Sequence, residues 1–163
     1  KNKINIRFVN TGLSTETGGR ILKIKKHLKN EDFFMVTYGD VISDINIKKQ
    51  ISYYKKRKKI ALLAAVSIPS RFGVLKIKRN NIIKNFSEKP KMTRQKVNGG
   101  YFIFSKKIFN FIKSSKTVLE ENPMRKLTKL NQLIAYKHNG FWQPVDSVKD
   151  KIQLEKILKK RNV

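Results

Sequence analysis

The chain of 163 residues has no cysteine and only two histidines, His27 and His138, which lie far apart in the sequence. The lack of cysteine excludes disulfides and cysteine-ligated zinc or iron–sulfur sites. The two histidines cannot form an i,i+4 metal motif. Apolar runs such as residues 60–66 fall far below the ~20 residues that a membrane-spanning helix needs. No apolar signal segment opens the sequence, so we expect a cytoplasmic protein without a membrane partner.

Acidic residues are also scarce, since 11 Asp and Glu face 38 Lys and Arg and leave a net charge of +27. Such a balance attracts phosphate-bearing partners and leaves a basic nucleic-acid-binding module open as an alternative. The tightest basic run, residues 55–59, follows a helical pattern at its C-terminal end, where cations complement the helix dipole. A solvated helix end is therefore favoured over a nucleic-acid patch. Four aromatic residues lie inside apolar strand-like runs and are expected in the core: Phe33, Phe34, Phe102 and Phe104.

Hydrophobic periodicity predicts one α/β domain with a mostly parallel, mixed sheet. Strands are expected at residues 4–9, 33–36, 61–68, 72–77, 82–86, 97–104 and 133–136. Helices are expected at residues 20–28, 45–56, 105–112, 123–130 and 147–158, with Asp44 capping the second of them. Ligands of such sheets bind beyond the carboxyl ends of the strands, so the loops that follow strands are the places to search for a site.

Two aspartates follow apolar segments. Asp40 comes directly after a strand-like run, and Gly39 before it permits close approach of a ligand to the backbone. Because Mg²⁺ takes one or two carboxylates together with substrate phosphates, Asp40 is a candidate metal ligand; a turn aspartate bonded to its own backbone is the alternative. Asp146 follows the aromatic, proline-containing segment 141–145 and is the natural partner of Asp40 as a metal ligand. The alternative is that Asp146 is the N-cap of the last helix.

Three further segments are candidates, each weak by itself. Residues 17–20 are rich in Thr and Gly and lead into a helix, whose first N–H groups attract anions. Glu88 and Lys89 offer a contact to a sugar hydroxyl and to a phosphate, with a surface ion pair as the alternative. Residues 98–100 permit close backbone approach or form a strand bulge. His138 is expected at the surface in a turn.

Taken in order, these segments resemble the sugar-phosphate nucleotidyltransferases over nearly the whole chain. The matching stretches are Thr-Gly-Gly-Arg (17–20), Thr-Tyr-Gly-Asp (37–40), Pro-Ser-Arg-Phe-Gly (69–73), Phe-Ser-Glu-Lys-Pro (86–90), Val-Asn-Gly-Gly-Tyr-Phe (97–102) and Gly-Phe-Trp-Gln-Pro-Val-Asp (140–146). Within the family, the likeness is greatest to enzymes that make CDP-glucose from CTP and glucose 1-phosphate. The resemblance implies a Rossmann-like nucleotidyltransferase fold and in-line attack of the sugar phosphate on the nucleotide, with release of pyrophosphate.

The resemblance also implies roles for individual residues. It implies that Mg²⁺ is held by Asp40 and Asp146. It implies nucleotide contacts by Thr15, Arg20 and Gly39, and sugar-phosphate contacts by Glu88, Lys89, Asn98 and Gly99. It further implies a homo-oligomer. A nucleotidyltransferase that uses another nucleoside triphosphate or sugar phosphate remains an alternative.

The sequence departs from the family pattern in two places. Val41 follows Asp40 where the family has Gly. The family's opening Gly-rich loop and its Lys-Pro-Lys-Pro segment have no match, so residues 1–163 are expected to be the central and C-terminal portion of a nucleotidyltransferase domain that lacks its N-terminal part. Turnover by these residues is expected to be weak or absent, because one lost transition-state donor costs ~10²–10³ in rate.

Overall fold

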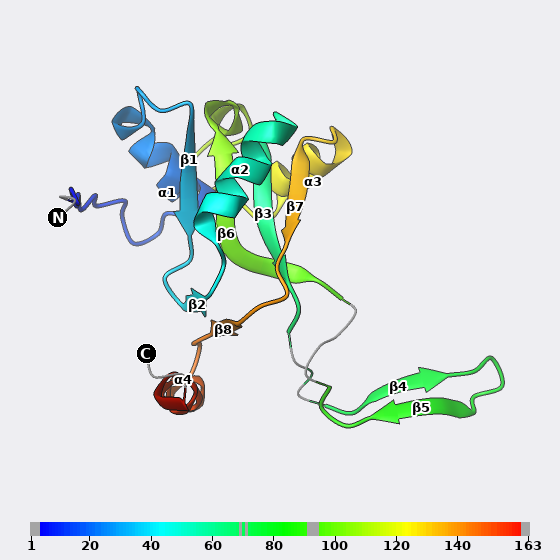
Figure 1. The fold of residues 1–163 in the computed structure, drawn as a ribbon. Coiled ribbons are helices and arrows are strands. Elements are labelled where there is room, and N and C mark those ends of the chain that lie inside the picture. Colours follow the sequence, from blue (N-terminus) through cyan, green and yellow to red (C-terminus); the bar gives the residue numbers. More distant parts are fainter. Residues whose placement is uncertain (1–3, 69, 71, 91–94, 161–163) are drawn as a thin grey trace. The chain divides into compact units, whose positions relative to one another are not determined.

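The computed structural model describes residues 4–68, 70, 72–90 and 95–160 (Figure 1). The helices are α1 (Thr17–Ile24), α2 (Ile47–Arg57), α3 (Asn122–Lys129) and α4 (Val148–Lys160), with 3₁₀ helices η1 (Lys25–His27) and η2 (Lys106–Asn110). The strands are β1 (Phe33–Thr37), β2 (Val41–Ser43), β3 (Ala61–Val66), β4 (Val74–Ile77), β5 (Ile83–Ser87), β6 (Val97–Ser105), β7 (Leu133–Lys137) and β8 (Trp142–Pro144). Pro69 and Arg71, which belong to one of the family-like stretches, lie outside the described residues.

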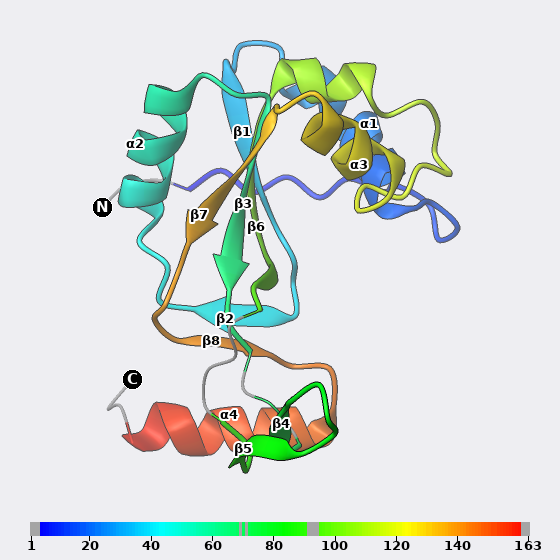
Figure 2. The same ribbon diagram turned by 90° about the vertical axis from the view of Figure 1, so that its right-hand side faces the viewer.

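A four-stranded sheet has the order β1-β6-β3-β7, and two smaller sheets are formed by β2 with β8 and by β4 with β5. In the larger sheet β6 runs opposite to its neighbours β1 and β3, whereas β7 runs parallel to β3 (Figures 1 and 2). The apolar run at residues 61–66 is buried, since five of the six residues of β3 are buried, whereas within β1 only Phe34 is buried. The predicted α/β fold with a mixed sheet is confirmed, but this sheet is not mostly parallel, because β6 runs opposite to both of its neighbours.

The chain forms two compact units, and the first comprises residues 1–35, 57–62 and 103–134. Its core contains Phe34, whose ring stacks on Phe109 at a centroid distance of 5.7 Å and is tilted against Phe104 at 5.8 Å. Helix α1 packs closely on the loop that precedes α3, because a Cβ on Gly19 would come within 2.3 Å of the Ser115 carbonyl oxygen. The two glycines of the Thr-Gly-Gly-Arg stretch therefore have a packing role in this unit.

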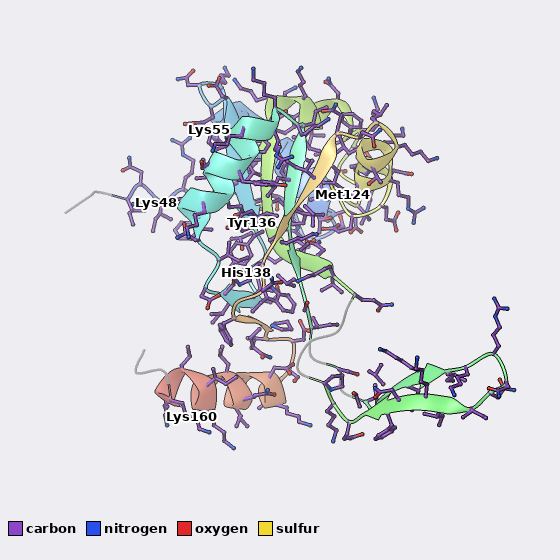
Figure 3. All side chains as sticks on the ribbon, turned by 45° about the vertical axis from the view of Figure 1, so that its right-hand side comes forward. Lys48, Lys55, Met124, Tyr136, His138 and Lys160 are labelled. Atoms are coloured by element: carbon purple, nitrogen blue, oxygen red, sulfur yellow. The ribbon has the colours of Figure 1, made fainter. Side chains whose placement is uncertain are left out.

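The second unit comprises residues 36–56, 63–102 and 135–163. Helix α2 contacts β7 through an edge-on pair of rings, Tyr53 and Tyr136, with centroids 5.7 Å apart (Figure 3). The hairpin of β4 and β5 turns at residues 78–82, where Asn81 has a positive φ of 64°. The predicted turn between the two strands is confirmed. Over the described part of the chain, no helix combines the length and apolar character needed to cross a membrane.

Four expectations about local structure are wrong. Residues 4–9 form no strand: Ile4, Ile6 and Phe8 are 84%, 75% and 94% exposed, and an alternating pattern forms a strand only where another strand pairs with it. The helix expected at residues 105–112 is shorter, a 3₁₀ helix over residues 106–110. Helix α2 is capped by Asn46, whose side-chain oxygen accepts from the Lys49 N–H at 2.9 Å, and not by Asp44.

The fourth concerns His138, whose side chain is only 11% exposed. Its Nε2 lies 3.0 Å from a carboxylate oxygen of Asp44 and 3.1 Å from the carbonyl oxygen of Phe141. Gly140 lies against the same pair, since a Cβ there would meet both side chains. His138 is thus largely buried in the turn at residues 137–140. The polar residues around it in the sequence indicated an exposed position instead.

Candidate functional site

The antiparallel pair of β2 and β8 brings two candidate residues together. Val41 lies opposite Pro144 in this pair, and the Val145 N–H donates to the Asp40 carbonyl oxygen at 2.8 Å. Asp40 directly precedes β2, and Asp146 follows β8 after one intervening residue. Since the start of one antiparallel strand lies beside the end of the other, both aspartates lie at the same end of this small sheet.

The two carboxylates are exposed. The N-cap role that the sequence left open for Asp146 belongs to Ser147, whose hydroxyl oxygen accepts from the Asp150 N–H at 3.2 Å and donates to the Asp150 carboxylate at 2.7 Å. This reciprocal contact satisfies a free N–H at the start of α4. The carboxylate of Asp146 is therefore not required for starting the helix.

The donor set at this place fits a hard divalent cation. Within the described ranges, no three His, Cys, Asp or Glu side chains gather where they would hold a metal ion, so a caged site is not formed there. A pair of carboxylates with open coordination positions suits Mg²⁺, which keeps several waters and binds substrate phosphates. Asp40 and Asp146 are the residues that would hold it.

The candidate glycine Gly99 is bound to β8. The indole N–H of Trp142 donates to the Gly99 carbonyl oxygen at 2.8 Å. A Cβ on Gly99 would lie 2.7 Å from Val66 Cγ1 and 3.4 Å from Trp142 Nε1, so only glycine fits between β3 and the indole. The space beside Gly99 is therefore occupied by the protein's own side chains, Val66 and Trp142.

Asn98, the neighbouring candidate, is held at both ends of its amide. Its nitrogen donates to the Tyr38 hydroxyl at 3.2 Å, and its oxygen accepts from the Gly100 N–H at 3.0 Å. Gly100 has φ of +75° and accepts at its carbonyl oxygen from the Tyr38 N–H at 2.9 Å. The positive φ supports the bulge-like alternative for this segment, and the network fixes the orientation of Asn98.

Tyr38 and Trp142 are the residues of this region that the sequence reasoning did not assign. Each lies in a family-like stretch, and Trp142 is the only tryptophan of the chain. Their residue types could have indicated such a role. Tyr and Trp combine an apolar ring with one polar atom, and that atom needs a hydrogen-bond partner when the ring is partly buried. The partner of the Tyr38 hydroxyl, however, is 60 residues away in the sequence, and the partner of the Trp142 indole is 43 residues away.

Glu88 and Lys89 follow β5 and form a surface ion pair, which was the alternative interpretation of these two residues. The Lys89 ammonium lies 3.5 Å from a Glu88 carboxylate oxygen, with the side chains 67% and 58% exposed. Such an exposed pair contributes little to stability. Gly73 lies next to it, since a Cβ on Gly73 would come within 2.9 Å of the other Glu88 oxygen.

Thr15 and Arg20 belong to the first unit. Thr15 is 6% exposed, and its hydroxyl donates to the Thr11 carbonyl oxygen and accepts from Lys23 Nζ at 3.2 Å. The exposed Arg20 guanidinium donates to the Thr11 hydroxyl at 2.8 Å. These contacts build a loop of hydroxyls, carbonyls and cations. Gly39, in the second unit, has open space around the position of a Cβ.

Comparison with known proteins places these motifs in a family. The family model described as nucleotidyl transferase matches residues 1–160. The chain is 37% identical over 156 residues to the glucose-1-phosphate cytidylyltransferase of Salmonella typhimurium, with 96% of this chain and 60% of that protein covered. It is 35% identical over 153 residues to the probable glucose-1-phosphate cytidylyltransferase of Bacillus subtilis, with 93% and 59% covered. The chain thus spans about 60% of the length of these relatives.

Solved structures agree on the fold. The crystal structure of HddC from Yersinia pseudotuberculosis matches with a TM-score of 0.62 at 23% identity, covering 88% of this chain and 63% of that chain. A putative glucose-1-phosphate thymidylyltransferase from Bacillus anthracis matches with a TM-score of 0.62 at 20% identity, covering 88% and 61%. The range that the family model matches includes all of the stretches that suggested the resemblance. The chain belongs to the nucleotidyl transferase family.

Proposed function

We propose that this chain contributes the metal-binding and sugar-phosphate-binding part of a glucose-1-phosphate cytidylyltransferase. In the reaction, a phosphate oxygen of glucose 1-phosphate forms a bond to the α-phosphorus of CTP, and the bond from that phosphorus to the pyrophosphate oxygen breaks. The products are CDP-glucose and pyrophosphate. The protein positions two anions and neutralises their charge.

The observation that carries this proposal is the pairing of β2 with β8, which brings Asp40 and Asp146 to one end of a small sheet. We assign both carboxylates to Mg²⁺, which would neutralise phosphate charge when bound. Trp142 fixes β8 against Gly99, so the same strand that leads to Asp146 also contacts the segment that we assign to the sugar phosphate. The relatives of 35–37% identity carry names that state this reaction.

The remaining candidates complete the proposal. We assign the sugar phosphate to Asn98 and Gly99 together with Glu88 and Lys89, whose exposed charges are available to a ligand. We assign nucleotide contacts to Arg20, to Gly39, whose surroundings are open, and to Thr15, which shapes the loop at residues 11–15. The large excess of lysine and arginine favours encounter with both polyanionic substrates.

Pyrophosphate release from CTP and glucose 1-phosphate, with Mg²⁺ present, tests the activity. We expect very low release by residues 1–163 alone, because no Gly-rich phosphate loop occurs in their sequence, but measurable Mg²⁺-dependent binding of glucose 1-phosphate. Brisk release would contradict the assignment of these residues to only part of the catalytic machinery. Absence of any glucose 1-phosphate binding would contradict the sugar-phosphate assignment.

Substrate choice, location and assembly belong to the same proposal. Comparison of CTP with UTP, dTTP and GTP tests the choice of nucleotide, and a preference for another base would replace CTP in the reaction. We place the protein in the cytoplasm, where nucleoside triphosphates and sugar phosphates are made. We also propose a homo-oligomer, which the mass in solution tests.

A further inference from the structure

Tyr38 connects the segment that we assign to the metal ion with the segment that we assign to the sugar phosphate, both within the second unit. Its backbone N–H donates to the Gly100 carbonyl oxygen at 2.9 Å, which attaches it to β6. Two residues later, the Asp40 carbonyl oxygen accepts from the Val145 N–H at 2.8 Å. The segment at residues 38–40 is therefore held at both ends, on β6 and beside the end of β8.

The ring of Tyr38 is packed against β6. A Cβ on Gly100 would come within 2.7 Å of Tyr38 Cδ2, and the Gly100 φ of +75° is a conformation that glycine adopts without strain. The Phe102 ring lies next to the tyrosine ring, tilted by 60° with the centroids 5.5 Å apart. These contacts determine where the ring lies and therefore where its hydroxyl lies.

The Tyr38 hydroxyl and the Gly100 backbone together determine which way the side-chain amide of Asn98 faces. The Gly100 N–H can only donate, so the amide atom that faces it at 3.0 Å is the oxygen. The amide nitrogen then donates to the Tyr38 hydroxyl oxygen at 3.2 Å. Because this nitrogen carries two N–H groups, the bond to Tyr38 leaves a second one for an oxygen of a ligand.

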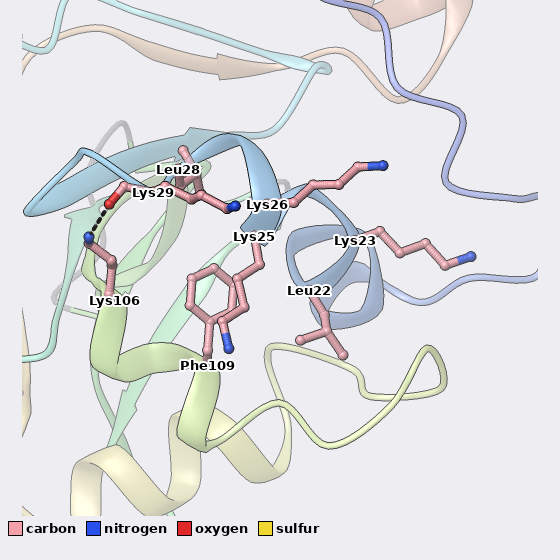
Figure 4. Close-up of a pocket in the computed structure, with 8 residues that line it drawn as sticks. All are labelled: Leu22, Lys23, Lys25, Lys26, Leu28, Lys29, Lys106 and Phe109. Atoms are coloured by element: carbon pink, nitrogen blue, oxygen red, sulfur yellow. Dashed lines mark hydrogen bonds between the residues drawn. The ribbon is translucent and has the colours of Figure 1, made fainter.

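The lysines of this basic chain attract anions in a different way. In the first unit, a hollow at the C-terminal end of α1 is lined by apolar side chains and lysines (Figure 4). Two of its ammonium groups have partners within the protein, since Lys106 Nζ donates to the Lys29 carbonyl oxygen at 2.7 Å and Lys25 Nζ lies 5.3 Å from the centre of the Phe109 ring. Such groups attract anions through charge, whereas Asn98 offers a neutral donor. A substitution that leaves the net charge unchanged therefore separates the two kinds of binding.

We propose that Tyr38 is a positioning residue for the sugar phosphate. Its hydroxyl holds the Asn98 amide so that an N–H group, and not the amide oxygen, meets an oxygen of the ligand. This inference rests on the proposed function, which assigns Asn98 to the sugar phosphate. Tyr38 acts through Asn98, and it begins the short segment that ends at Asp40, so the groups for the sugar phosphate and for the metal ion are attached to the same three residues.

Calorimetric titration of the whole chain with glucose 1-phosphate in the presence of Mg²⁺ tests this role. Tyr38→Phe keeps the ring and the net charge but removes the hydroxyl, and we expect the affinity to fall about fivefold, the size of one lost hydrogen bond. The affinity for Mg²⁺ alone should stay the same, because Asp40 keeps its own backbone bond to Val145. Tyr53→Phe is the matched control, which removes a hydroxyl from α2 and should leave both affinities unchanged.

A double-variant cycle tests whether Tyr38 acts through Asn98. Asn98→Ala should lower the affinity for glucose 1-phosphate, and the addition of Tyr38→Phe should cause no further loss, while thermal unfolding checks that each variant is folded. Losses that multiply in the double variant, or an unchanged affinity in Tyr38→Phe, would overturn the positioning role and leave the proposed function intact. A parent chain that binds no glucose 1-phosphate would contradict the proposed function itself, and the positioning role with it.

Discussion

The Val145 N–H donates to the Asp40 carbonyl oxygen at 2.8 Å, and this bond extends the pairing of β2 with β8 up to the two aspartates. A backbone contact between residues 105 positions apart sets the separation of Asp40 and Asp146 more firmly than side-chain rotamers would. Because the bond uses main-chain atoms, side-chain substitutions of either aspartate leave it in place. The two carboxylates can therefore be changed without moving the strands.

Trp142→Phe should weaken the attachment of β8 to β6. The substitution keeps a ring in place but removes the donor to the Gly99 carbonyl oxygen, so we expect a loss of about 1 kcal/mol in the free energy of unfolding. Urea denaturation followed by circular dichroism measures it. Gln143→Ala is the control, because the Gln143 amide donates to Pro144 within the same strand. Equal stability of Trp142→Phe and the parent chain would show that the indole bond does not hold the strand.

Gly19→Ala should destabilise the first unit strongly. A Cβ at this position would come within 2.3 Å of the Ser115 carbonyl oxygen, which is backbone and cannot move aside cheaply, so we expect a loss of roughly 1–3 kcal/mol. Thermal unfolding measures the difference. Gly39→Ala is the matched control, since nothing lies within 4 Å of its Cβ position and its stability should change by less than about 0.5 kcal/mol. Similar melting temperatures for both variants would contradict the close packing of α1.

Ser147→Ala should loosen the start of α4. The hydroxyl that accepts from the Asp150 N–H is lost, and we expect a decrease of about 1 kcal/mol in the free energy of unfolding. Asp146→Asn should leave this free energy nearly unchanged, because Ser147 serves as the cap. Chemical denaturation of the two variants compares them. A larger loss for the Asp146 variant would return the capping role to the aspartate and weaken its assignment to the metal.

Sequence reasoning found what depends on local pattern. The apolar run before Asp40 predicted β1, and two strand-like runs on either side of residues 79–81 predicted the hairpin, because such runs and turn residues are local features of the sequence. The same reasoning failed at residues 4–9, where a strand requires a partner that the pattern does not contain. It also placed the N-cap of α2 two residues too early. Asp44 and Asn46 are both good N-cap residue types, and the structure distinguishes them because Asp44 contacts His138 while Asn46 caps the helix.

In the candidate site, too, local motifs could be predicted from the sequence, whereas contacts between distant segments could not. Asp40 and Asp146 were paired from the family-like motifs, while their physical link through β2 and β8 involves only three residues in each strand, too few for a periodic signal. The bonds from Trp142 to Gly99 and from Tyr38 to Asn98 join segments far apart in the sequence. Such contacts are decided by tertiary packing, which a single sequence does not display.

The central claim is that Asp40 and Asp146 bind one divalent cation. Mg²⁺ titration, followed by calorimetry and by the fluorescence of Trp142, the only tryptophan of the chain, tests it directly. Asp40→Asn and Asp146→Asn should each weaken Mg²⁺ binding by at least about tenfold, and the double variant should be little weaker than either single one, because residues sharing one ion are not additive. Glu155→Gln, which removes an exposed carboxylate from α4, should leave binding unchanged. Unchanged Mg²⁺ affinity in either aspartate variant, or losses that simply add in the double variant, would contradict the claim.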